Sequence, residues 1–450
     1  MDRVGATTVT HTEGVPHDNN LAFVAGCTAI FTAGLSTALR AAVAGFMKTE
    51  FLDPIDPGRS GTLIGVALGA AFLGFSLMLL VTSTILDRIG MKNMLMMSAT
   101  TFVVGTVTVM GAGAAGAATA SYHVIVAGML VTGLGWGAME GTVNPLVAAL
   151  YPLETTQHMN RLHAWWPAGL MVGGLAGVVA AKLGLDWRLI LALVPISATV
   201  LGVLTLRSQF PLTTSAQLGV SGLDRFREAL RRPSFFIWFV LMLFTAASEL
   251  APEQWVDVAL TRVVGMRGVL LLVYVAAIQF IGRHFSGVLV RVLSAEGLLC
   301  VSCVLAAVGL FGLGFARDPA GALLATTAWG LGVCYLWPTM VAIVAQRYRR
   351  GGAFTVGLMG VAGSISSYFA LPLLGTVYDQ AKLEAAGGAL ALSTLRPGQL
   401  DAVLVYAASR SFQTVAIIPA LLVIAFGFVW ALARSKGKVG GGGAIAAKGV

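Results

Sequence analysis

The chain has 450 residues, of which 57% are hydrophobic and only 11% are charged, and its formal net charge is +9. Because a soluble globular domain carries roughly 25% charged residues, this composition excludes a water-soluble fold and makes the lipid bilayer the solvent. We therefore predict an all-α membrane protein that crosses the bilayer many times.

The apolar residues fall into twelve segments that are long enough to cross a membrane, since a hydrocarbon layer of about 30 Å takes about 20 helical residues. Six segments lie on each side of a polar stretch. This division predicts a tail, a six-helix bundle, a linker, a second six-helix bundle and a disordered tail, at 1–20, 21–206, 207–233, 234–433 and 434–450. The twelve segments are 21–47, 60–86, 93–113, 121–149, 160–182, 188–206, 234–259, 268–290, 297–316, 321–345, 353–377 and 411–433.

The basic residues indicate the orientation. With the N-terminus inside, 18 of the 29 lysines and arginines fall on the inner side and 10 on the outer side, and Arg40 is the remaining one. Because cytoplasmic loops are enriched in positive charge, we predict that both termini are cytoplasmic and that the protein lies in the cell inner membrane. The same distribution accounts for the positive charge without a nucleic-acid partner. In the linker, Leu223, Phe226 and Leu230 share one helical face, which predicts a basic helix on the membrane surface.

Arg40 lies inside the first apolar segment, about seven residues from its outer end. Two interpretations of this buried cation are open. Its side chain can extend to the outer headgroups. Alternatively, it can cross a central cavity and pair with Glu249 or Glu253 of the seventh segment, and we include Arg40 among the expected substrate-binding residues on that basis.

The loop between the second and third segments carries the run Ser83-Thr-Ile-Leu-Asp87-Arg88-Ile-Gly-Met-Lys92. A carboxylate at a helix end, a glycine turn and nearby cations can hold the inner side of a transporter closed, although an ordinary cytoplasmic loop can carry the same residues. The run resembles the signature of the major facilitator superfamily, with Ser83 in place of its first glycine and Met91 in place of one basic residue. The resemblance implies two six-helix bundles related by a pseudo-twofold axis, with alternating access to a site between them. It also implies that Asp87, Arg88 and Lys92 form a gate.

The fourth segment places Glu140 and Asn144 four residues apart, on one face of a helix. A charged carboxylate near the centre of a membrane helix costs about 2.5–3.5 kcal/mol, so Glu140 must face a cavity or carry a proton. The run Met139-Glu140-Gly-Thr-Val-Asn144-Pro145 resembles the Glu-Thr-x-x-Asn-Pro of the fucose and glucose permease branch, whose glutamate takes part in proton coupling. The resemblance implies proton coupling by Glu140, and we expect Asn144 to line the substrate site. The alternative is that Glu140 is a hydrogen-bond partner in helix packing.

The fifth segment is rich in glycine and carries three large polar or aromatic residues near its inner end. Closely spaced glycines allow two helices to approach, which is one interpretation. The other is a loose resemblance to the glycine-rich fifth-helix motif of antiporters. We expect His163, Trp165 and Trp166 to be anchors at the membrane interface. The glycines are Gly169, Gly173, Gly174 and Gly177.

The run Glu249-Leu-Ala-Pro252-Glu-Gln254-Trp255 in the seventh segment reads as a broken helix, because Pro252 removes a backbone hydrogen bond. Membrane proteins tolerate such breaks where the backbone lines a cavity. We therefore expect Glu249, Gln254 and Trp255 to bind the solute, because an amide and a ring are the contacts that a sugar-like solute needs. For Trp255 the alternative is a place in the interfacial aromatic belt.

The eighth and tenth segments add further candidates. The run Gly-Arg283-His284-Phe-Ser-Gly287 resembles the junction between helices eight and nine in the same permease branch, which implies that Arg283 belongs to the gate; an ordinary basic inner loop is the alternative. Gln279 and, near mid-membrane, Tyr335 and Trp337 are expected to line the substrate cavity. For the two aromatic residues helix packing is the alternative.

Together these residues favour a secondary active transporter that moves a sugar or sugar-like compound with protons. The alternative is an exporter, a proton antiporter of amphipathic drugs or lipids, and an apolar cavity with Arg40 and Glu249 turned away from it would favour that function. The permease branch also uses an aspartate in its first helix, where this chain has no acid. Because no nucleophile and base stand at catalytic spacing, we do not expect an enzyme. We expect a monomer in the lipid bilayer, with a small-molecule substrate and protons as partners and with no metal or cofactor.

Overall fold

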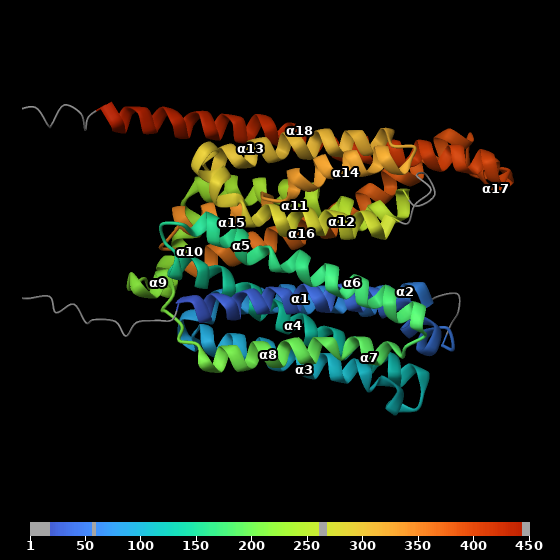
Figure 1. The fold of residues 1–450 in the computed structure, drawn as a ribbon, viewed down its shortest axis with the longest axis horizontal. Helices are drawn as coiled ribbons and strands as arrows, with labels where there is room; N and C mark the ends of the chain where they lie inside the picture. Colours follow the sequence, from blue (N-terminus) through green and yellow to red (C-terminus); the bar gives the residue numbers. More distant parts are fainter. Residues whose placement is uncertain (1–18, 56–59, 261–267, 443–450) are drawn as a thin grey trace, which may run out of the picture.

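The computed structural model describes residues 19–55, 60–260 and 268–442, and within these ranges the chain is helical and has no strand (Figure 1). The helices of the first half are α1 (Asn19–Met47), the π-helix η1 (Lys48–Leu52), α2 (Ser60–Ile89), α3 (Met91–Met110), the 3-10 helix η2 (Ala112–Ala115), α4 (Ala118–Leu150), α5 (Thr155–His163), α6 (Trp165–Leu183), α7 (Trp187–Leu191) and α8 (Leu193–Arg207).

Two short helices, α9 (Thr214–Gln217) and α10 (Gly222–Arg231), follow in the linker. The helices of the second half are α11 (Pro233–Leu260), α12 (Gly268–His284), α13 (Ser286–Phe315), α14 (Pro319–Val333), α15 (Leu336–Arg347), α16 (Gly352–Ala386), α17 (Ala389–Thr394) and α18 (Pro397–Gly442). Helix α18 therefore extends beyond both ends of the predicted twelfth segment.

These helices make twelve membrane spans in two six-helix bundles, which confirms the predicted fold class. Ten of them in the described residues are long and apolar enough to cross a membrane, and two shorter apolar helices, Leu270–His284 and Gly352–Ser366, complete the set. Some spans are broken: α5 continues as α6, α7 as α8, and α14 as α15. Helix α13 is kinked at Ser294, whose φ of 64° and ψ of 170° are not helical, so we assign its start to the eighth span together with α12.

The two bundles lie side by side with their helices roughly parallel to one long direction (Figure 1). The linker helices α9 and α10 lie at one end of the bundles. Helix α1 begins and α18 ends at that same end, which we call the linker end. An even number of spans requires this arrangement.

Helix α10 is amphipathic, as the residue pattern of the linker predicts. Leu223, Phe226 and Leu230 are about half exposed, whereas Arg225 and Ala229 on the opposite side are buried. Phe226 also contacts the ring of Phe354 in α16, with 5.6 Å between the centroids. The helix is therefore attached to the second bundle and leaves an apolar face uncovered.

Glycines in α6 bring this helix into direct backbone contact with α1. A Cβ atom on Gly169 would lie 2.3 Å from the carbonyl oxygen of Phe31, and one on Gly34 would lie 2.3 Å from that of Trp166. Gly173 faces Ala38 in the same way. Because no side chain fits in this contact, the packing interpretation accounts for Gly169, Gly173 and Gly177.

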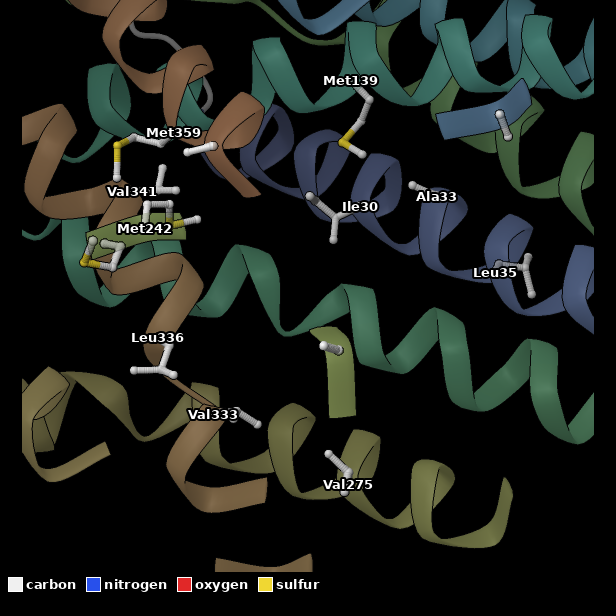
Figure 2. Close-up of a cluster of buried hydrophobic side chains, with 14 of the residues drawn as sticks. Ile30, Ala33, Leu35, Met139, Met242, Val275, Val333, Leu336, Val341 and Met359 are labelled. Atoms are coloured by element: carbon white, nitrogen blue, oxygen red, sulfur yellow. The ribbon is translucent and has the colours of Figure 1, made fainter. Parts of the chain in front are cut away.

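A continuous apolar cluster joins the two bundles. Ile30 and Met139 of the first bundle belong to the same buried cluster as Met242, Val341 and Met359 of the second (Figure 2). Each of these five side chains is at most 1% exposed. Polar groups in the adjoining interface are consequently shielded from water by apolar neighbours.

The predicted break at Pro252 is wrong, since α11 continues through this residue from Pro233 to Leu260. Pro252 has no N–H for the carbonyl of Ser248, four residues earlier. The indole N–H of Trp329 in α14 donates to that carbonyl instead, at 3.3 Å. A neighbouring helix thus satisfies the free group and the helix keeps its course.

Candidate functional site

The first bundle places a chain of polar side chains at membrane depth in α4 and α5. The amide nitrogen of Asn144 donates to the carboxylate of Glu140 at 3.0 Å, and His163 Nε2 lies 2.8 Å from the Asn144 carbonyl oxygen. Since the Asn144 nitrogen already donates to Glu140, its oxygen is the acceptor and His163 carries its proton on Nε2. All three residues are at most 6% exposed. Glu140 thus lies at the end of a buried hydrogen-bonded chain.

The second bundle contributes Arg283 of α12, which contacts this series of polar residues and is 3% exposed. Its Nη2 forms an ion pair with Glu249 of α11 at 3.1 Å, and its Nε donates to the carbonyl of Cys334 at 2.6 Å. Its Nη1 crosses to the first bundle and donates to the carbonyl of His163 at 2.8 Å. One guanidinium therefore connects both bundles at the site. Arg283 was predicted to be a gate residue of an inner junction, and it lies instead in this buried network.

Two prolines explain why Arg283 finds these acceptors. A proline has no N–H, so the carbonyl four residues before it loses its helical partner. Pro167 follows His163 by four residues, and Pro338 follows Cys334 by four. Both carbonyls accept from Arg283. The helix breaks between α5 and α6 and between α14 and α15 thus form a cradle for a guanidinium group.

Gln279 lies one turn before Arg283 on α12 and faces two carboxylates of α11. Its amide nitrogen is 3.5 Å from Glu249 Oε1 and 3.2 Å from Glu253 Oε1. The other oxygen of Glu249, Oε2, is buried and has no hydrogen-bond partner among the residues that the structure describes. The site therefore contains an acceptor that can receive a hydrogen bond from a bound solute.

The aromatic candidates of the tenth span flank this network. The Tyr335 hydroxyl donates to the carbonyl of Gly282 at 2.9 Å, where it holds the break before α15 against α12. Trp337 lies close to the carboxylate of Glu140, which belongs to the opposite bundle. The ring of Trp337 also packs directly on Gly363 of α16. Both aromatic residues thus lie beside the charged groups of the site.

The bundles are in direct contact on the linker side of this network. A Cβ on Gly357 of α16 would lie 2.4 Å from that of Ser83 in α2, and one on Gly287 would lie 2.3 Å from the Gln157 side chain of α5. Asn160 of α5 also donates to the hydroxyl of Thr339 in α15 at 3.1 Å. These contacts close the site toward the linker end.

The predicted gate residues after α2 have separate environments. Asp87 forms an ion pair with Arg225 of α10 at 2.7 Å and accepts hydrogen bonds from Thr213 and Ser215 of the linker. Lys92 donates to the carbonyl of Leu206 at 2.7 Å and so binds the end of α8. Arg88 is exposed. Asp87 therefore ties α2 to the linker that joins the two bundles.

Arg40 does not pair with Glu249 or Glu253, which corrects that interpretation. Its guanidinium donates to the hydroxyls of Ser36 and Thr37 on its own helix, at 2.9 and 3.2 Å. It is 6% exposed and lines a cavity of about 10 Å³ enclosed by α1, α3, α4, α7 and α8. Because it points into the first bundle, Arg40 neither reaches the outer headgroups nor takes part in the network of Arg283.

The prediction that His163 is an interfacial anchor is also wrong, since this residue links Asn144 to Arg283. The neighbouring tryptophans pack on rings of other helices. Trp166 stacks on Trp136 of α4, and Trp165 lies against Phe280 of α12, with 5.2 and 5.9 Å between ring centroids. Pro167 was a signal for the role of His163, because it frees the carbonyl that Arg283 binds.

Two candidates are not covered by the structure: the side chains of Gln254 and Trp255 lie outside the described part of the chain. In the described residues, no group of three or more histidine, cysteine or acidic side chains is arranged to hold a metal ion.

A model of the major facilitator superfamily matches residues 21–371, so the chain belongs to this superfamily of membrane transporters. It is similar to the solved structure of the fucose:proton symporter FucP of E. coli, with 14% identity, a TM-score of 0.66, and coverage of 89% of this chain and 98% of that one. No match was found among curated proteins.

Two further solved structures show the same fold. The proton:xylose symporter XylE bound to 6-bromo-6-deoxy-D-glucose is 14% identical, with a TM-score of 0.71 and coverage of 90% of this chain and 94% of that one. The human organic anion transporter MFSD10 (TETRAN) is 12% identical, with a TM-score of 0.69 and coverage of 91% and 99%. At these identities the likeness defines the fold and leaves the solute to be argued from the site.

Proposed function

We propose that this transporter moves a small polar solute, a sugar or sugar-like compound, and couples its movement to protons by alternating access. The observation that carries this proposal is the buried network in which Glu140, Asn144 and His163 of one bundle meet Arg283 and Glu249 of the other. Ionisable groups at membrane depth are costly and are retained where they bind solutes or carry protons.

The unpartnered acceptors of the site favour a solute with several hydroxyl groups. Within the described part of the chain, Glu249 Oε2 and Asn160 Oδ1 are both buried without a donor. A buried acceptor without a partner costs roughly 1–3 kcal/mol, and a solute hydroxyl that donates to it recovers this energy. Sugars and polyols carry such donors, and the fold neighbours FucP and XylE are described as sugar:proton symporters.

Glu140 is the proposed proton-coupling residue. Its carboxylate receives a hydrogen bond from the neutral amide of Asn144, and no ion pair compensates its charge in the described part of the chain. In this setting the protonated carboxyl is favoured over the carboxylate. When water reaches the site, it solvates the carboxylate and the proton can leave. Alternating exposure of the site then loads and unloads the proton.

The test is solute accumulation in proteoliposomes under an imposed pH gradient. The solute would be chosen by a thermal-shift screen of sugars, polyols and organic acids, because a bound ligand stabilises the protein by mass action. We expect Glu140→Gln to abolish accumulation and to retain exchange of labelled for unlabelled solute. The matched control is Glu384→Gln, a change at an exposed carboxylate outside the network, which should behave as wild type.

Accumulation that persists in Glu140→Gln would reject Glu140 as the coupling residue. One observation favours the alternative solute class, amphipathic drugs or lipids: the side chain of Arg40 is turned into the first bundle. The position of Glu249 in the network favours a polar solute. If the same screen detected binding of lipophilic cations and no binding of sugars, the exporter function would be favoured instead. We also propose cytoplasmic termini, on the strength of the charge distribution between loops. A monomer in the cell inner membrane stays a prediction.

A further inference from the structure

The second bundle holds two carboxyl groups that share one amide and one cation. Glu249 and Glu253 are four residues apart on α11 and therefore share a face. The Gln279 amide nitrogen bridges their Oε1 atoms at 3.5 and 3.2 Å. Arg283 forms an ion pair with Glu249 at 3.1 Å. Two acidic side chains thus face a single guanidinium.

The other titratable groups around this pair do not supply a second positive charge. His163 uses its Nε2 proton for Asn144 and meets Arg283 only through its carbonyl. The Cys334 thiol donates to the carbonyl of Gln279, and Tyr335 donates to that of Gly282. Within the described residues, one negative charge of the pair is therefore not compensated by a cation. Glu249 is buried and Glu253 is partly buried, and two such carboxyls that share one cation cannot both stay ionised at low cost.

The contacts indicate which carboxyl is ionised. Glu249 receives Arg283 and Gln279 on its Oε1 atom, and charge-assisted hydrogen bonds of this kind favour a carboxylate. Among the described residues, the donor to Glu253 is the neutral amide of Gln279. We propose that Glu253 carries a proton in this closed conformation and is a second proton site, which belongs to the second bundle and is separate from Glu140. This inference rests on the proposed function and adds a second proton-binding group to it.

The bundle interface provides a means of releasing this proton. The hydrogen bond from Arg283 to the His163 carbonyl joins the bundles, so it is lost when they separate around the site. Arg283 can then turn toward Glu253, since both helices that carry them, α11 and α12, belong to the same bundle. The O–H bond of Glu253 breaks, its proton passes to water, and the carboxylate pairs with the guanidinium.

Infrared spectroscopy of the purified protein tests this inference without any solute. Protonated carboxyls absorb separately from carboxylates and shift in heavy water, so they can be counted in a detergent that has no ester groups. In wild type at neutral pH we expect this band to contain Glu140 and Glu253. Glu140→Gln and Glu253→Gln should each remove about half of it, and the double variant should remove it.

Glu249→Gln is the sharper variant, because it leaves Glu253 in place. In this variant Arg283 has lost its partner, so Glu253 becomes the counter-ion and gives up its proton. We expect the band of protonated carboxyls to fall as far as in Glu253→Gln. Glu249 does not contribute to this band in wild type, because it is ionised, so the loss would come from Glu253. This variant also provides the measurement if Glu253→Gln does not fold. Glu384→Gln is the control, because Glu384 is exposed and lies outside this network.

A band that is unchanged in Glu253→Gln overturns the inference, and so does a band that is unchanged in Glu249→Gln. Either result leaves the transport proposal intact if Glu140→Gln still abolishes accumulation. The opposite result is also possible: the wild-type protein accumulates no solute, but the band falls in both Glu253→Gln and Glu249→Gln. That result contradicts the proposed function and supports the second proton site. The two failures are therefore distinguishable.

Discussion

Arg283 is the residue whose contacts organise the site, because its planar guanidinium donates in three directions to three helices. A lysine cannot reproduce this fork, since its ammonium is a point charge on a flexible chain. Two of the acceptors are carbonyls that Pro167 and Pro338 have freed, so the position of the cation depends on helix breaks far apart in the sequence. The third is Glu249, whose second oxygen has no hydrogen-bond partner among the described residues.

Arg283→Gln is expected to destabilise the protein by about 3–5 kcal/mol, because it leaves the Glu249 carboxylate buried without its partner. The double variant Arg283→Gln with Glu249→Gln removes both charges and should recover part of this loss. Arg283→Lys should keep most of the stability and lose transport. Thermal unfolding in detergent and uptake in proteoliposomes measure the two effects. Equal stability of the single and double variants would contradict the ion pair seen here.

At the scale of the elements, glycine and proline decide how the helices of the site meet. Gly169 and Gly34 bring α1 and α6 into backbone contact, which leaves no room for side chains between them. Proline acts differently: Pro252 leaves α11 continuous because Trp329 satisfies the free carbonyl of Ser248. The effect of a proline therefore depends on which neighbouring group can reach the carbonyl it frees.

Gly169→Ala tests the close packing of α1 and α6. The new Cβ would lie 2.3 Å from the Phe31 carbonyl oxygen, a backbone atom that cannot move without separating the helices. We expect a loss of about 1–3 kcal/mol in the free energy of unfolding, as for other overpacked sites. Gly174→Ala on the same helix is the matched control, because its Cβ would meet only Val273, at 3.8 Å. Similar melting temperatures for the two variants would contradict this view of the interface.

The whole molecule is closed at the linker end in this conformation. Ser83 packs against Gly357, Gln157 packs against Gly287, and Asn160 bonds to Thr339, each pair joining the two bundles. Small residues at these places let the bundles meet without a permanent bond, and a transporter that alternates access must break such contacts in every cycle. The ion pair between Asp87 and Arg225 also attaches the linker to α2 at this closed end.

Gly357→Leu should hold the linker end open, since even a Cβ at this position would lie 2.4 Å from that of Ser83. Spin labels at the exposed positions Arg88 and Arg350 would report the separation of the bundles. We expect a longer distance distribution in Gly357→Leu than in the unsubstituted labelled protein, and slower transport. Gly69→Leu is the control, because no atom lies within 4 Å of the new Cβ. An unchanged distribution would show that this contact does not govern closure.

The sequence alone determined that the chain is a twelve-span protein of two bundles, because hydropathy and segment length depend only on local composition. It also marked Glu140, Asn144, Gln279 and Glu249 as polar groups at membrane depth, since their neighbours along the chain are apolar. The partners of these groups were decided by the tertiary structure. Arg40 turned into its own bundle, His163 entered the interface, and Arg283 took the place beside Glu249 that the sequence suggested for Arg40. A side chain's partner depends on which helices lie side by side, and helices distant in the sequence meet only in the folded protein.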